Sequence, residues 1–156
     1  MRLTVPIAAA ALALLFVANM ALAGTLSVGS LTITGLWTTA TPPGAPTAAA
    51  YLTITNNGTT PDSLVAVSSP MASVGMLHRM DLSGGIASMQ MVPAIDIPPG
   101  KTVHLAPDAF HVMFVTLKQP LKAGETMPVT LIFQKAGRLD AALPVLPIGS
   151  KGPPGQ

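Results

Sequence analysis

Apolar and polar residues alternate in short runs along most of the chain, and turn-forming residues separate the runs. Successive side chains of a β-strand point to opposite faces of its sheet, so this alternation predicts half-buried strands. No stretch after residue 23 has sustained helical periodicity. The pattern predicts an all-β sandwich or barrel of about eight to ten short strands, with their order left open. The expected strands are residues 31–34, 48–55, 63–67, 74–80, 86–92, 95–97, 102–105, 111–117, 127–134 and 139–145.

Proline, glycine and asparagine mark the boundaries of these strands. Residues 41–46 contain paired prolines, which cannot continue a strand ladder and therefore predict a loop. Gly35 and Trp37 are expected to end the first strand. Residues 81–85 form a turn signal, so the strands on either side of it are expected to pair as a hairpin.

The first 23 residues have the features of a secretory signal peptide. A basic Arg2 precedes an apolar stretch over residues 6–17, and Ala21-Leu22-Ala23 is an A-x-A cleavage site, so we expect cleavage after Ala23 and export to the periplasm. An uncleaved membrane anchor is the alternative, but the apolar run is short for a spanning helix. No cysteine follows the segment, which argues against a lipid anchor.

The remaining sequence divides into one domain and a tail. Residues 24–147 are expected to form the β-sandwich, and residues 148–156 a flexible tail. Without Arg2 the chain has seven basic and six acidic residues, which supports neither nucleic-acid nor anionic-membrane binding. Because the chain has no cysteine, it forms no disulfide, and its stability must come from core packing.

All three histidines and five methionines lie between residues 76 and 113. Residues two apart on a strand share a face, so three segments each present histidine or methionine side chains in register. The interleaved Val112 and Phe114 are expected to face the core. The three sets are Met76, His78 and Met80, then Met89 and Met91, then His111 and Met113. If these segments converge, four soft donors surround one ion.

Thioether sulfur and neutral imidazole nitrogen favour copper(I) over zinc, and a blue-copper site would need a cysteine thiolate. The opposing interpretation is that methionines fill the core as adaptable hydrophobes. We apply that interpretation to Met71 and Met127, and we interpret His104 as an exposed strand histidine that is not a ligand. Met76, Met80 and Met91 are candidates for outer contacts or a hydrophobic rim.

The spacing of His78, Met89, His111 and Met113 is H-x10-M-x21-H-x-M. This motif resembles that of the PCu(A)C family of periplasmic copper chaperones, and the resemblance extends from about Trp37 to Val145. It includes the segments 40–44, 50–56, 69–70, 120–124 and 131–133. Where the family commonly has a Pro-Gly-Gly turn before its second histidine, this chain has residues 107–110, Pro-Asp-Ala-Phe.

The resemblance implies a cupredoxin-like β-sandwich without a blue-copper centre, in which those four residues bind one copper(I) ion. It also implies delivery of copper to the Cu(A) centre of cytochrome c oxidase subunit II, with a Sco-type thiol protein as a partner. The alternative function is a methionine-rich interaction module without metal transfer. An enzyme is not expected, because no hydrolase motif is present and scattered aspartates usually form turns. The scattered aspartates are Asp81, Asp96 and Asp108, of which Asp81 and Asp108 are at expected turns.

Overall fold

The computed structural model describes residues 24–154, which form eleven β-strands and one short 3-10 turn. The predicted signal peptide lies outside the described residues. Within residues 24–154 no helix is long and apolar enough to cross a membrane. The elements are β1 (Leu26–Val28), β2 (Leu31–Thr39), β3 (Thr47–Asn56), β4 (Asp62–Ser68), β5 (Ala72–Asp81), η1 (Ser83–Gly85), β6 (Ser88–Met91), β7 (Ile95–Ile97), β8 (Thr102–Leu105), β9 (Phe110–Leu117), β10 (Thr126–Phe133) and β11 (Gly137–Leu146).

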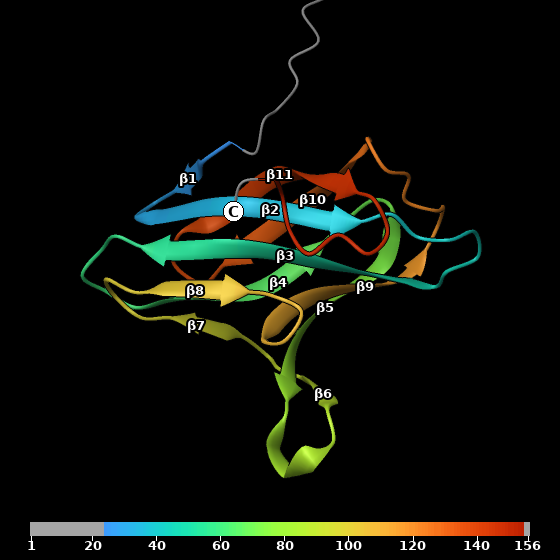
Figure 1. The fold of residues 1–156 in the computed structure, drawn as a ribbon. Coiled ribbons are helices and arrows are strands. Elements are labelled where there is room, and N and C mark those ends of the chain that lie inside the picture. The colour runs from blue at the N-terminus through green and yellow to red at the C-terminus, as the bar shows by residue number, and fades with distance from the viewer. Residues whose placement is uncertain (1–23, 155–156) are drawn as a thin grey trace, which may run out of the picture.

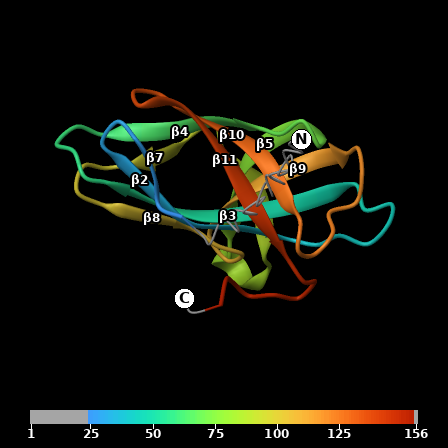
Figure 2. The same ribbon diagram turned by 90° about the horizontal axis from the view of Figure 1, so that it is seen from above.

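The strands form one strongly curled sheet with the order β6-β5-β9-β8-β3-β2-β11-β10-β4-β7, and β1 pairs with β2. Seen from above, the curl brings β4 and β7 over against β3 and β8 in a half-barrel (Figure 2). The β5–β6 hairpin projects beyond this body (Figure 1). The prediction of an all-β sandwich or barrel is therefore confirmed.

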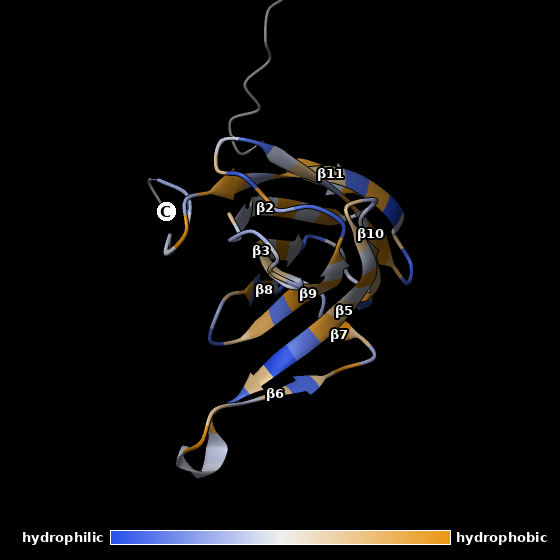
Figure 3. Cartoon of the chain, turned by 90° about the vertical axis from the view of Figure 1, so that its right-hand side faces the viewer, coloured by the Kyte–Doolittle hydropathy of each residue, from blue (hydrophilic) through white to orange (hydrophobic). Residues whose placement is uncertain are grey.

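Alternating apolar side chains fill the interior of the curl. Val112 and Phe114 on β9 are buried, as expected from their alternation with His111 and Met113. Met127 is 0% exposed and Met71 packs against the core, so the packing role expected of both is confirmed. Apolar colour follows the body of the sheet, whereas a hydrophilic section marks β5 where the hairpin leaves the body (Figure 3).

The first long strand differs from its prediction. β2 does not end at Gly35 and Trp37 but continues to Thr39. Gly35 has a φ of +58°, and the pairing with β3 shifts register between Thr34 and Trp37. Gly35 therefore sits in a β-bulge, which bends a strand without ending it. β1, a strand of three residues that pairs with β2, was not predicted.

Two close contacts hold β4 in place. The buried Asp62 carboxylate accepts hydrogen bonds of 2.9 Å each from the backbone N–H groups of Lys135 and Ala136, and so closes the turn between β10 and β11. At the other end of β4, the backbone of Val67 lies against Gly75 of β5 so closely that a Cβ on Gly75 would overlap the Val67 carbonyl group. This contact between β4 and β5 holds β5, the central strand of the candidate site, in position.

Candidate metal centre

The hairpin β5–β6 is set by its turn. The Asp81 carboxylate accepts a hydrogen bond of 2.9 Å from the Ser83 N–H, and Gly84 and Gly85 both have positive φ. Asp81 thus acts as a turn former, as expected, because a short carboxylate can bond the backbone two residues on. The hairpin pairs His78 with Met91 and Met80 with Met89. The expected pairing of the two segments is confirmed, although β6 is shorter than the predicted strand 86–92.

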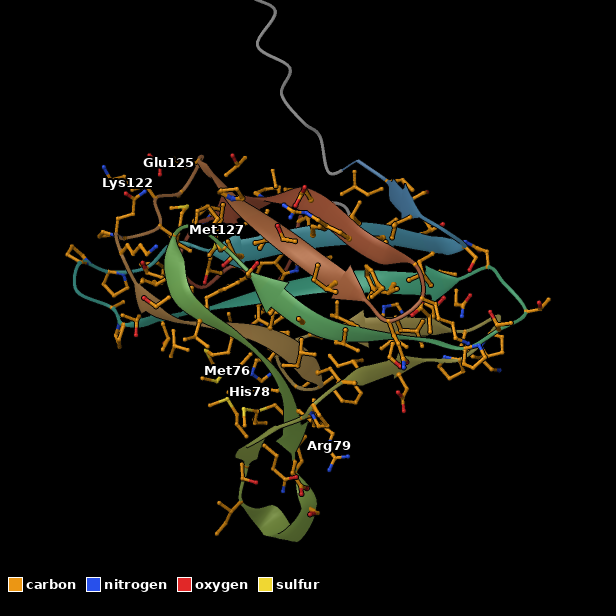
Figure 4. The ribbon with its side chains drawn as sticks, turned by 180° about the vertical axis from the view of Figure 1, so that it is seen from behind. Met76, His78, Arg79, Lys122, Glu125 and Met127 are labelled. Atoms are coloured by element: carbon orange, nitrogen blue, oxygen red, sulfur yellow. The ribbon has the colours of Figure 1, made fainter. Side chains whose placement is uncertain are left out.

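Strand register brings the three histidine and methionine segments together. β5 also pairs with β9, where His78 lies opposite His111 and Met76 lies opposite Met113. Met76 and His78 project to one side of β5, and Arg79 projects to the other (Figure 4). Directly opposite residues on neighbouring strands point to the same face of a sheet. The three adjacent strands β6, β5 and β9 therefore present their histidines and methionines on one shared face.

The two histidine rings lie in contact distance of each other. Their centroids are 5.5 Å apart and their planes are nearly perpendicular, at 84°. His111 is only 3% exposed, and its Nδ1 lies 3.4 Å from the Ala109 carbonyl oxygen. A carbonyl only accepts, so Nδ1 carries the proton in this hydrogen bond and the lone pair is left on Nε2. Metal-binding histidines typically have this arrangement, in which the second nitrogen is held by a backbone carbonyl.

Burial also favours the neutral form of His111. Removal from water is the largest effect and lowers the pKa of His111 from its ordinary value. The hydrogen bond to Ala109 raises this pKa, and the neighbouring His78 lowers it again. A neutral imidazole is the form that binds a metal ion, because the proton and the metal compete for the same lone pair.

His78 carries the most informative atom of this face. Its Nδ1 is buried and has no hydrogen-bond partner. Burying a polar nitrogen without a partner destabilises a fold by about 1–3 kcal/mol, so such atoms are rare in native proteins. A bound cation would satisfy this nitrogen. The donors present, two imidazoles with thioethers nearby, fit a soft ion such as copper(I).

The methionines of this face differ in exposure. Met113 and Met76 are half-buried, whereas Met89 is 56% and Met91 is 72% exposed. The register places Met91, not Met89, directly opposite His78. Met89 lies two pairs farther toward the hairpin tip, beyond the pair Arg79–Gln90, and is on the diagonal from His78. Sequence spacing alone missed this relationship, because the length of the turn decides which methionine faces which residue.

The other candidate groups lie apart from this face. His104 is exposed on β8 and bonds the Thr53 hydroxyl at 3.1 Å through its Nδ1, so its expected role as an exposed strand histidine is confirmed. Asp96 accepts a hydrogen bond from the Ser63 hydroxyl. Across residues 24–154, no three side chains of histidine, cysteine, aspartate or glutamate gather as a metal-binding group. Any site for an ion on this face thus depends on thioethers.

The sequence of the chain is similar to proteins that are described as putative lipoproteins. Residues 31–145 match the family described as "Putative lipoprotein LpqE-like". "Putative lipoprotein Lxx21020" of Leifsonia xyli subsp. xyli is 36% identical over 103 residues, which are 65% of this chain. The match spans 62% of the length of that relative.

Solved structures of copper proteins share the fold. The copper-bound PCuAC domain of PmoF2 is 27% identical, with a TM-score of 0.70 over 80% of this chain and 98% of that domain. The copper(I) form of DR1885 from Deinococcus radiodurans is 40% identical, with a TM-score of 0.61 over 80% of this chain and 81% of that protein. The TM-scores show that these neighbours share the half-barrel fold of this chain. The match to the family model covers most of the strands of this chain. The chain belongs to the LpqE-like family.

Proposed function

We propose that this protein is an exported copper(I) carrier that holds one ion on the face shared by β5, β6 and β9. The observation that carries the proposal is the buried, unpartnered Nδ1 of His78 beside the buried ring of His111. The ligands are His78, Met89, His111 and Met113, two imidazoles and two thioethers. The copper-loaded structures among the relatives support the choice of metal.

The chemistry of these donors suits transport. Copper(I) has no strong geometric demand and accepts both donor types. All four donors are neutral, so the complex with copper(I) keeps the positive charge of the ion. A site without a compensating carboxylate suits reversible transfer of the ion. Acceptor thiolates displace the thioethers one at a time, by ligand exchange without any change of oxidation state. The protein therefore acts as a carrier and not as an enzyme.

The same proposal includes the destination of the ion. Residues 1–23 act as a signal peptide cleaved after Ala23, which places the carrier in the periplasm. There it passes copper(I) to the Cu(A) site of cytochrome c oxidase subunit II, alongside a Sco-type thiol protein. The resemblance of the His78-to-Met113 spacing to that of PCu(A)C chaperones supports this destination.

A copper(I) titration under reducing conditions, against a chromophoric chelator, tests the proposal. The expected result is one tight equivalent for the wild type, and its loss in His111→Ala and in Met113→Ala. His104→Ala is the matched control, because His104 is an exposed histidine on a neighbouring strand and should leave binding unchanged. Unchanged binding in both His111→Ala and Met113→Ala would contradict the site.

A second function is favoured by the apolar side chains exposed on the hairpin. Leu82, Ile86, Met89 and Met91 are each more than half exposed. Such a cluster is typical of a protein-binding surface. In this alternative, the hairpin docks a partner and no metal is transferred. The same titration separates the two functions, since an interaction module binds no copper(I) equivalent.

A further inference from the structure

Met91 occupies the position across the hairpin from His78. The Val92 N–H donates to the Leu77 carbonyl at 2.9 Å, so Leu77 and Val92 are a hydrogen-bonded pair. Such pairs alternate with non-hydrogen-bonded ones, in which the Cα atoms are only about 4.5 Å apart and the side chains are closest. His78 and Met91 are therefore a closely spaced pair. Met89 is one non-hydrogen-bonded pair farther along, opposite Met80.

Both methionines of β6 are held out in solvent. Met91 is 72% and Met89 56% exposed, whereas Met127, a methionine that fills the core, is 0% exposed. The two β6 side chains thus contribute little to packing, and their sulfurs are free to move over the histidine pair. Methionine has three rotatable bonds, so either thioether reaches an ion bound beside His78.

Met91 also borders an apolar groove that Met89 does not line. The groove has a volume of about 280 Å³ and runs along β5 between the ends of β4 and β6. Met76 and Met91 line it together with Val67, Val74 and Pro93. Met91 therefore lies between the pair His78 and His111 and the apolar groove.

We infer that Met91 is a second, interchangeable thioether ligand, which replaces Met89 on the ion held by His78, His111 and Met113. The inference rests on the proposed copper(I) function. In the exchange, the Met91 sulfur donates a lone pair to copper(I) as the Met89 sulfur withdraws its own, and no electron is transferred. The ion keeps its number of donors while its β6 ligand changes from the methionine nearer the hairpin tip to the one that lines the groove.

Double-mutant analysis of copper(I) affinity tests this exchange. Met89→Leu, Met91→Leu and the double variant are titrated with copper(I) against the same chelator. Leucine keeps the apolar volume and removes the sulfur. Each single variant should lose less than about fivefold in affinity, and the double variant at least about 50-fold, because the two thioethers replace each other. Met80→Leu, alone and with Met89→Leu, is the control, and its effect should be additive.

X-ray absorption at the copper edge gives an independent result. Met89→Leu should retain the same number of sulfur neighbours as the wild type, and the double variant should lose one. If Met89→Leu alone loses as much affinity as the double variant, or loses a sulfur neighbour, the inference is wrong while the copper(I) function stands. If the wild type binds no copper(I), the proposed function itself fails.

Discussion

His78 lies directly opposite His111 in the β5–β9 strand pair, with its ring nearly perpendicular to that of His111 and 5.5 Å away. The backbone hydrogen bonds of two paired strands hold this relationship, so it exists before any ion arrives. Two imidazoles prepositioned in this way reduce the ordering that binding would otherwise require. The thioethers of β6 are exposed and adaptable by comparison.

The first prediction concerns the tautomer of His111. Because Nδ1 faces the Ala109 carbonyl, we expect the metal-free protein to carry the His111 proton on Nδ1, with Nε2 unprotonated. Long-range 1H–15N correlation spectra of the imidazole rings distinguish the two tautomers. A spectrum with the proton on Nε2 would contradict the assignment of Nε2 as the metal-binding atom.

The second prediction is the pH dependence of copper(I) affinity. Burial, with the nearby His78, lowers the pKa of His111 below that of a free imidazole, about 6.5, which favours its neutral form at pH 7. Protons compete with the ion only as the pH falls through this lowered pKa. We therefore expect constant affinity above about pH 7 and a steady loss toward about pH 5, measured by chelator competition. A flat affinity over this range would show that the histidines are not ligands.

The third prediction concerns Asp62, which is 6% exposed. Burial raises the pKa of this carboxyl, but the backbone N–H groups of Lys135, Ser63 and Ala136 outweigh that effect and hold the pKa below its usual value. A lowered pKa stabilises the fold above the unfolded pKa of about 3.9, and the contribution is lost as the pH falls through the folded pKa. Asp62→Ala should reduce the free energy of unfolding by about 2–4 kcal/mol at neutral pH, because buried N–H groups lose their acceptor.

Urea unfolding at neutral and acid pH measures this effect. The gap between Asp62→Ala and the wild type should narrow as the pH falls below the unfolded pKa of about 3.9, because the stabilisation from the charged carboxyl is then progressively lost. Asp140→Ala is the control, because Asp140 forms an exposed ion pair with Arg138 at 2.9 Å and should leave the midpoint unchanged. An equal gap at both pH values would contradict the role of the carboxylate charge.

The fourth prediction tests the crossing of β4 and β5. Gly75→Ala would place a Cβ against the Val67 carbonyl group and 2.8 Å from the Cγ2 atom of the Val67 side chain. The strands must separate to admit it, so we expect a loss of about 1–3 kcal/mol in the free energy of unfolding, as for other overpacked sites. Ser73→Ala on the exposed part of the same strand is the control. Equal stability of both variants in urea would show that β4 moves aside freely.

Periodicity alone is enough to predict most strands. It also predicts which methionines lie on the same strand face as His78 and His111. Val112 and Phe114 are buried because they alternate with His111 and Met113, and this alternation is visible in the sequence. The core role of Met127 was predicted with less direct support, since nothing local distinguishes a core methionine from a ligand.

Longer-range relationships could not be read from the pattern. The hairpin turn decides that His78 lies opposite Met91. The alternation of side chains would be the same if His78 lay opposite Met89, so it does not distinguish the two pairings. The bulge at Gly35 resembles a strand end in sequence, because glycine permits both. The role of Asp62 depends on N–H groups more than 70 residues away, and that of Gly75 on a carbonyl of another strand. None of these contacts has a local signal.

The position of β6 at the end of the sheet order has a kinetic consequence. All four of its residues are exposed, so fraying of β6 from β5 gives up a few backbone hydrogen bonds and almost no buried surface. Amides in such a strand exchange with solvent by local opening, far more often than the whole domain unfolds. Under the proposed function, this opening withdraws both β6 thioethers while His78 and His111 stay in place on β5 and β9. Under that function, the residence time of the ion would follow the opening of a short edge strand and not the unfolding of the domain.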